Sequence, residues 1–171
     1  KHLIRKKLNI PLRQLNNRQN FLSSAERRAG QECGSGCLAY QADGFGGLPT
    51  RNFSSGTFEF ADDISGENWR EMILKRGGEG ETTHACMPGC IIRCSNIFAG
   101  EDGKTILSPI EYETIGLMGS NLGIRELDMI GRLNWQANDL GICSIELGAA
   151  LGVAAEAGFM EWGDGKRALE L

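Results

Sequence analysis

The sequence has no long apolar run. None of its hydrophobic stretches approaches the ~20 residues that a membrane-spanning helix needs, and the charged N-terminus is not followed by the short apolar stretch of a signal peptide. Internal repeats with a solenoid period are also absent, and no segment is of low enough complexity to be called disordered from its composition. We therefore expect a packed, cytoplasmic protein with no membrane span.

Strand-like alternation is scarce as well. Only residues 57–60 and 90–98 offer short extended pieces, and the segment around Pro49, residues 48–53, is expected to be extended because a residue before proline avoids the helical region. Helical patterns and stop signals fill much of the remainder. The expected helices are residues 62–75, ended by Gly77 and Gly78, residues 124–137, and residues 143–157, ended by Gly158. The predicted fold class is mainly α.

Acidic residues are nearly missing from the first thirty positions. Residues 1–30 hold eight lysines and arginines against the single acidic residue Glu26. Such a segment can bind nucleic acid or an anionic membrane, but aromatic residues do not alternate with these charges as a stacking surface requires. We expect no nucleic-acid partner, and we interpret residues 1–30 as a docking or linker segment beside a helical domain of residues 31–171.

Cysteines are too few for a disulfide scaffold, and three of the six are crowded within nine residues. These three are Cys86, Cys90 and Cys94. Pro88 and Gly89 disfavour a helix here, so we expect a loop whose thiolates can hold three corners of a cubane iron–sulfur cluster, with a fourth ligand from elsewhere. Zinc, with His84 as an additional ligand, is an alternative, and three free core thiols are another. Cys33 and Cys37 have the spacing of helix neighbours and suggest no metal role.

Two carboxylates lie near the clearest helix start. Ser108 is expected to be the N-cap, Pro109 the first helical residue, and Glu111 the member that closes a capping box onto the Ser108 backbone. Glu111 is thus predicted to be mainly structural. Glu113 lies beyond the cap, which makes it the better candidate for an acid–base or substrate-facing role.

A polar turn precedes the last long helix. Exposed backbone N–H groups at a helix start suit an anion or a heterocycle, although most such turns are plain N-caps. Short polar side chains in this turn could reach an adjacent ring. The candidate binding residues are Asn138, Asp139, Gly141, Ile142, Cys143 and Ser144.

Four ordered stretches resemble the aldehyde ferredoxin oxidoreductase family, and the resemblance covers roughly residues 30–171. They are residues 47–53 with 64–67, residues 86–94, residues 111–114 with 119–124, and residues 138–144. In that family a metal held by two pterins oxidises aldehydes to carboxylic acids, and a nearby [4Fe–4S] cluster passes electrons toward ferredoxin.

The resemblance implies roles for the motifs just described. The three crowded cysteines match three cluster ligands, Glu113 or Glu111 matches a carboxylate that works with a histidine elsewhere, and residues 138–144 match a pterin-binding turn. Implied cofactors are a [4Fe–4S] cluster and a tungsten or molybdenum bis-pterin. Implied partners are the remaining domains of the same enzyme, ferredoxin or an electron-transfer subunit, and a small carbonyl substrate.

The sequence departs from the family pattern at several points. The usual cysteine spacing has two and then three intervening residues, whereas three residues separate Cys86 from Cys90 here. Asn138 and Cys143 stand where aspartates are usual. The family's fourth cluster cysteine lies in a later copy of the turn, so Cys143 is not assigned as a ligand. We expect a middle helical domain that does not catalyse alone; a cluster-only electron-transfer module and a zinc-stabilised interaction domain are the alternatives.

Overall fold

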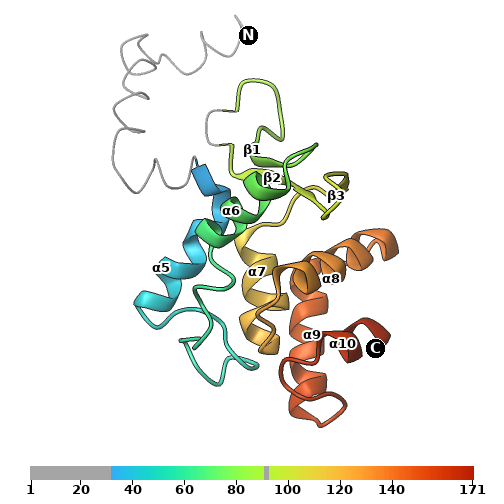
Figure 1. Cartoon of the computed structure of the whole chain (residues 1–171). Coiled ribbons are helices and arrows are strands. Elements are labelled where there is room, and N and C mark those ends of the chain that lie inside the picture. Colours follow the sequence, from blue (N-terminus) through green and yellow to red (C-terminus); the bar gives the residue numbers. More distant parts are fainter. Residues whose placement is uncertain (1–31, 91–92) are drawn as a thin grey trace, which may run out of the picture.

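The computed structural model describes residues 32–90 and 93–171, so the predicted basic segment of residues 1–30 lies outside the described residues. Its helices are α5 (Leu38–Gly44), α6 (Gly66–Arg76), α7 (Tyr112–Met118), α8 (Leu127–Leu140), α9 (Ser144–Glu156) and α10 (Gly165–Glu170), with short 3-10 helices η1 (Gly34–Cys37) and η2 (Ser120–Leu122). Three strands, β1 (Glu81–His84), β2 (Ser95–Ala99) and β3 (Thr105–Leu107), form a small sheet. The mainly α class is confirmed (Figure 1).

The sheet is antiparallel in the order β1-β2-β3. The expected extended piece at 90–98 overlaps β2, whereas residues 57–60 form no strand, and β1 and β3 were not predicted. Four of the five β2 residues are buried and β3 has only three residues, so neither strand shows the alternation that marks a half-buried strand. Figure 1 shows this sheet at one end of the described structure, α9 and α10 at the other, and α7 and α8 between them.

The core joins α6, the sheet and α8. Trp69 of α6 stacks on Phe98 of β2 with ring centroids 4.4 Å apart, and both side chains are almost fully buried. Gly131 of α8 lies against the same ring, because a Cβ atom there would come within 2.5 Å of Phe98. Burying each large apolar side chain contributes about 1.5–3 kcal/mol, so this stack fastens the sheet to two helices.

Helix α6 begins later than predicted. Ser65 is its N-cap and accepts a hydrogen bond from the Asn68 N–H at 3.2 Å, while residues 61–64 form turns, so the expected start at residue 62 is wrong. The capping hydroxyl favours a start at Gly66. The predicted stop is confirmed: Gly77 is the C-cap, with a φ of 63° that glycine adopts without steric cost.

The capping box predicted before α7 is wrong. The helix starts at Tyr112, and its N-cap Glu111 makes no side-chain capping bond. Ser108 Oγ instead donates to the Asn96 carbonyl at 2.8 Å, and the Ile110 N–H donates to Asn96 Oδ1 at 3.0 Å. These bonds to β2 hold the segment outside the helix, and the structural role predicted for Glu111 loses its basis.

Residues 48–53 are extended only in part. Arg51, Asn52 and Phe53 have φ values of 43°, 52° and 62°, three successive residues in the left-handed region. Each costs roughly 1–2 kcal/mol in a residue with a side chain, so the surrounding structure must hold them. The N–H groups of Asn52 and Phe53 donate to the carbonyl and side-chain oxygens of Asn121 at 3.1 and 3.2 Å. Asn121 is fully buried and its side chain also donates to the Gly148 carbonyl of α9, so residues 51–53 are tied to the core. We call residues 51–53 the left-handed turn.

Helices α8 and α9 lie near the predicted ranges. Helix α8 is shifted by three residues from the expected 124–137, and α9 matches the expected 143–157 within one residue at each end. Gly141, with a φ of 70°, ends α8 and separates the two. No single helix in the described part of the chain is long and apolar enough to cross a membrane. Helices α8 and α9 taken together have the length and composition of a membrane span, but the pair is bent by 116°.

Candidate functional site

A hollow of about 240 Å³ lies where the start of α7 meets α8 and α9. Its lining residues come from four segments of the chain and include both candidate carboxylates. They are Pro109, Glu111, Glu113, Thr114, Asn134, Asn138, Ser144 and Ile145. The structure therefore brings the two glutamates to the polar turn, although 24 or more positions separate them in sequence.

The walls of this hollow are fastened by specific contacts. Helices α7 and α9 approach closely at Gly148, where a Cβ would lie 2.7 Å from the Leu117 Cβ. Thr114 Oγ1 donates to Ser144 Oγ at 3.3 Å, which joins the first turns of the two helices. On the other side, Asn134 of α8 is 3% exposed and donates to the Pro109 carbonyl at 2.8 Å. Because these contacts join α7 to α9 and α8 to Pro109, the residues that line the hollow are held in fixed positions relative to one another.

The two carboxylates have different surroundings. Glu111 is half-buried, and burial followed by the nearby charge of Glu113 raises its pKa above the ordinary value. Glu113, in the first turn of α7, is exposed. The charge of Glu111 also contributes to raising the pKa of the Cys94 thiol, so Glu111, which lines the hollow, is also near Cys94.

We expect Glu111→Gln to leave the free energy of unfolding unchanged or slightly higher at pH 7. No capping bond is lost, and a carboxylate whose folded pKa is raised is destabilised in its charged form above its unfolded pKa. Thermal unfolding of the full-length protein at pH 7 measures the change. A loss of the size of a helix cap, about 0.5–2 kcal/mol, would restore the capping-box interpretation.

The polar turn contributes only its two ends to the hollow. Asn138, in the last turn of α8, and Ser144, the first residue of α9, line it. The other four predicted residues are exposed beyond it, namely Asp139, Gly141, Ile142 and Cys143. Cys143 is the N-cap of α9 and makes no side-chain capping bond. A ligand that touched the whole turn would therefore extend out of the hollow along the start of α9.

The three crowded cysteines lie between β1 and β2, in a segment of which residues 91 and 92 are not described. Cys86 is exposed, while Cys90 and Cys94 are half-buried, and none of the three forms a disulfide with another described residue. Burial, then Glu111, then the neighbouring thiols raise the pKa of Cys94, so the sulfur atoms influence one another. Among residues 32–90 and 93–171, no three histidine, cysteine or acidic side chains already converge on a metal-binding position. The donor type fits an iron–sulfur cluster, but the ligand geometry is not preassembled.

Histidine 84, the additional ligand in the zinc alternative, has a partner. Its Nδ1 lies 2.9 Å from the carboxylate of Glu81, which is three positions earlier in β1. Cys33 and Cys37 are both buried, and burial is the largest cause that raises the pKa of Cys33 to about 11 and that of Cys37 in the same direction. Both thiols stay protonated near neutral pH, unlike a metal-bound thiolate.

The segment that carries these two cysteines packs directly on the cysteine loop. The Ser35 N–H donates to the Cys94 carbonyl at 3.0 Å, and Ser35 Oγ accepts a hydrogen bond from the Tyr112 N–H at 3.1 Å. Gly34 has a φ of 64°, and a Cβ there would lie 2.6 Å from the Cys94 carbonyl oxygen. Sequence reasoning missed these contacts; the pair of glycines around Ser35 was the only signal of a close approach.

Comparison with known proteins adds the family. The protein-family model described as aldehyde ferredoxin oxidoreductase, domains 2 and 3, matches residues 14–171 of this chain. The chain belongs to the aldehyde ferredoxin oxidoreductase family. Curated tungsten-containing aldehyde ferredoxin oxidoreductases of Thermococcus kodakarensis and Pyrococcus abyssi are 35% identical over 112 residues and 36% identical over 109 residues, in each case 63% of this chain. The Pyrococcus furiosus protein of the same name is 32% identical over 110 residues.

The chain spans 16% of the length of these aldehyde ferredoxin oxidoreductases. The family match includes the cysteine loop, both glutamates and the polar turn, so it covers every part of the candidate site. The predicted family is therefore confirmed, whereas the roles of the individual site residues stay predictions.

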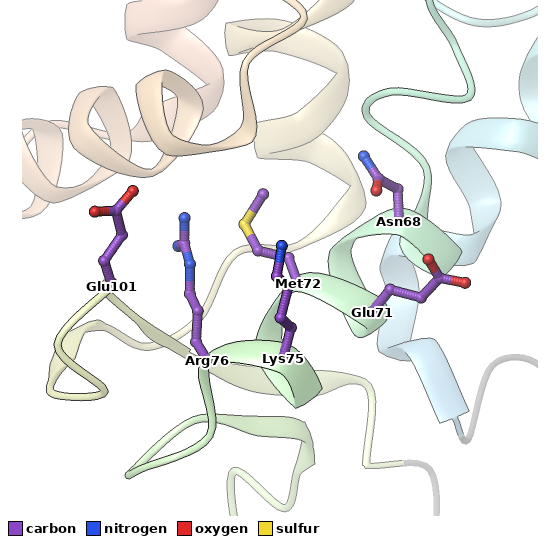
Figure 2. Close-up of a pocket in the computed structure, with 6 residues that line it drawn as sticks. All are labelled: Asn68, Glu71, Met72, Lys75, Arg76 and Glu101. Atoms are coloured by element: carbon purple, nitrogen blue, oxygen red, sulfur yellow. The ribbon is translucent and has the colours of Figure 1, made fainter.

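A second, larger hollow in this member of the family lies away from those motifs. Its volume is about 580 Å³, and Figure 2 shows side chains from α6 in a row, with Arg76 next to Glu101 of the turn after β2. Arg76, one of its two cations, is already engaged: it makes two hydrogen bonds of 2.7 and 2.8 Å to Asp128 and one of 3.1 Å to the Ala99 carbonyl. None of the predicted site residues lines this hollow, and we assign it no role in the site.

We expect Gly34→Ala to lower the free energy of unfolding by about 3 kcal/mol. Left-handed backbone costs a residue with a Cβ roughly 1–2 kcal/mol, and overpacking against the Cys94 carbonyl adds about 1–3 kcal/mol. Gly46→Ala is the matched control, because its φ is 75° but an added Cβ meets nothing within 4 Å. Thermal unfolding of the full-length protein should rank the two; equal losses would contradict the close approach at Cys94.

Proposed function

We propose that this chain is the helical part of a tungsten- or molybdenum-bis-pterin oxidoreductase that oxidises an aldehyde or related carbonyl compound. Its electrons would leave through a [4Fe–4S] cluster to ferredoxin or an electron-transfer subunit. The observation that carries the proposal is the hollow that joins Glu111, Glu113, Asn138 and Ser144, with Cys94 of the cysteine loop near enough to Glu111 for its charge to act on the thiol. A carboxylate pair and the ends of a polar turn share this hollow, and a loop with three thiols comes near Glu111; these are the parts that such chemistry requires.

The residues of the chain would divide the work among them. Cys86, Cys90 and Cys94 would supply three thiolates to the cluster, which is held by cysteine sulfur in most proteins. Asn138, Asp139, Gly141, Ile142, Cys143 and Ser144 would contact a pterin. When bound, the metal–pterin group supplies the oxidising centre for the carbonyl carbon.

Glu113 would be the acid–base group of the site. It is exposed at the hollow and makes no hydrogen bond or ion pair with any described residue, so its carboxylate is available to hold or move a substrate proton. Glu111 would support it from the half-buried side. The fourth cluster ligand, the second part of the pterin cradle and the histidine partner would come from other domains of the enzyme, in agreement with the 16% coverage of the relatives.

The two alternative functions explain less of the site. A cluster-only electron-transfer module would leave the hollow with its two glutamates without a purpose, and Glu111 has no capping duty that would account for it. A zinc-stabilised interaction domain would use the cysteine loop and His84, and it would likewise give the two glutamates at the hollow no purpose. A cytoplasmic location and the absence of a nucleic-acid partner stay predictions from the sequence.

Metal analysis and a visible absorption spectrum of the full-length protein, purified without oxygen, test the proposed function. We expect iron together with tungsten or molybdenum, and absorption from an iron–sulfur cluster. Zinc as the only stoichiometric metal would reject the proposal. Iron without tungsten or molybdenum, in protein expressed with both metals supplied, would favour the cluster-only module.

A further inference from the structure

We propose that Ser35 is a positioning residue that keeps the cysteine loop and the carboxylate-bearing helix α7 in fixed register. Its backbone N–H bonds the carbonyl of Cys94 at 3.0 Å, and its side-chain oxygen accepts from the N–H of Tyr112 at 3.1 Å. One residue thus contacts both halves of the candidate site. We call these two hydrogen bonds of Ser35 the clamp. The catalytic consequence of the clamp rests on the proposed function, whereas the clamp itself is independent of that function.

The bond to Tyr112 replaces a local helix cap. The first N–H groups of a helix have no partner within it, and Glu111, the N-cap of α7, makes no side-chain capping bond. Ser35 supplies the missing acceptor from 77 positions away in sequence. Because a hydrogen bond from a distant segment fixes where a helix starts in space, Ser35 sets the position of the first turn that carries Glu113.

The backbone at Ser35 is held as firmly as its side chain. Gly34 is left-handed and lies so close to the Cys94 carbonyl that only glycine fits, and Gly36 packs on the backbone of Gly66, which would be 3.3 Å from an added Cβ. The hydroxyl therefore projects from a fixed point. A displacement of Cys94 would therefore move Ser35, and the bond from Tyr112 to Ser35 would shift the start of α7.

A second contact joins the same two parts. Asn96 of β2, two positions after Cys94, is 1% exposed, and its side chain bonds the N–H and the carbonyl of Ile110, just before α7. Asn96 therefore anchors β2 to residues 108–110, which precede α7, while Ser35 anchors the cysteine loop to α7 itself. With Asn96 intact, loss of the Ser35 hydroxyl should shift the first turn of α7 without detaching the segment.

Hydrogen–deuterium exchange of the full-length protein tests the clamp. We expect Ser35→Ala to speed exchange in the peptide that covers the start of α7 by about 10-fold, as expected when one N-cap bond is lost, and Ser35→Thr to restore protection. Ser65→Ala is the matched control, because it removes an N-cap acceptor from α6 and should leave α7 unchanged. Unchanged exchange in Ser35→Ala, or no restoration in Ser35→Thr, would overturn the proposal.

A double-mutant cycle on turnover tests the positioning role. We expect Ser35→Ala to lower kcat by about 10-fold with little change in KM, and to have no further effect in a Glu113→Gln background, since residues that act as a unit are not additive. Full additivity would show that Ser35 acts only through stability. If the protein has no turnover or lacks iron, the proposed function fails, while the exchange measurement still decides the clamp.

Discussion

Replacing Glu113 with glutamine in the full-length enzyme is expected to lower turnover by about 100-fold or more while metal content and folding stay normal. Loss of a positioned general acid or base has an effect of roughly 10²–10⁴-fold. Glutamine keeps the size of the side chain, and Glu113 makes no bond to a described residue that its loss could break. Steady-state assays at matched tungsten or molybdenum occupancy measure the effect.

Glu111→Gln is the paired variant for this experiment. Both glutamates line the hollow, but Glu111 is half-buried beside the cysteine loop whereas Glu113 is exposed to the hollow. We expect a loss of about 10-fold or less from Glu111→Gln, through its electrostatic influence on Glu113. The opposite ranking would move the acid–base role to Glu111 and leave the remainder of the site as proposed.

Serine at any of the three loop cysteines is expected to remove most of the cluster iron from the full-length enzyme. A cubane that loses one thiolate ligand is held by the remaining ligands only, and serine is a poor substitute for thiolate toward iron. Iron analysis and the visible spectrum of Cys86→Ser, Cys90→Ser and Cys94→Ser measure the loss, together with electron transfer to ferredoxin.

Cys37→Ser provides the control for those variants. Its thiol is buried and donates to the Gly34 carbonyl at 3.3 Å, a bond that a serine hydroxyl can also make. Iron content should therefore stay near that of the unaltered enzyme. Full iron in all three loop variants, or iron loss in Cys37→Ser, would show that the ligands were assigned to the wrong cysteines.

Local signals predicted where two of the helices end. Gly77 ends α6 and Gly158 follows α9, and both stops could be recognised because left-handed backbone favours glycine. The prediction failed at Ser108, where the sequence has the pattern of a capping box. Bonds from Asn96, a residue of another element, hold that segment outside the helix, and no local pattern reports such a contact.

The candidate site was predicted as three separate motifs. The family resemblance rested on those motifs together with residues 47–53, 64–67 and 119–124, and the structure adds that Glu111, Glu113, Asn138 and Ser144 share one hollow. The role of Ser35 could not be predicted, because its partners Cys94 and Tyr112 are distant in sequence and a Gly-Ser-Gly segment usually indicates only a turn. Contacts between segments, rather than the segments themselves, were the missing information.

The left-handed turn at residues 51–53 has a consequence for limited proteolysis. Arg51 lies on the surface, with a side chain 35% exposed, and would be a candidate for cleavage by trypsin. Trypsin binds its substrates as extended chains, whereas the backbone on both sides of the Arg51–Asn52 bond is left-handed and bonded to Ser120 and Asn121. Susceptibility depends on how the affected backbone is bonded and not on exposure alone. The peptide bond after Arg51 should therefore resist trypsin in the native protein until the hydrogen bonds from residues 52 and 53 to the buried Asn121 break. Cleavage at this bond would then report opening of the core.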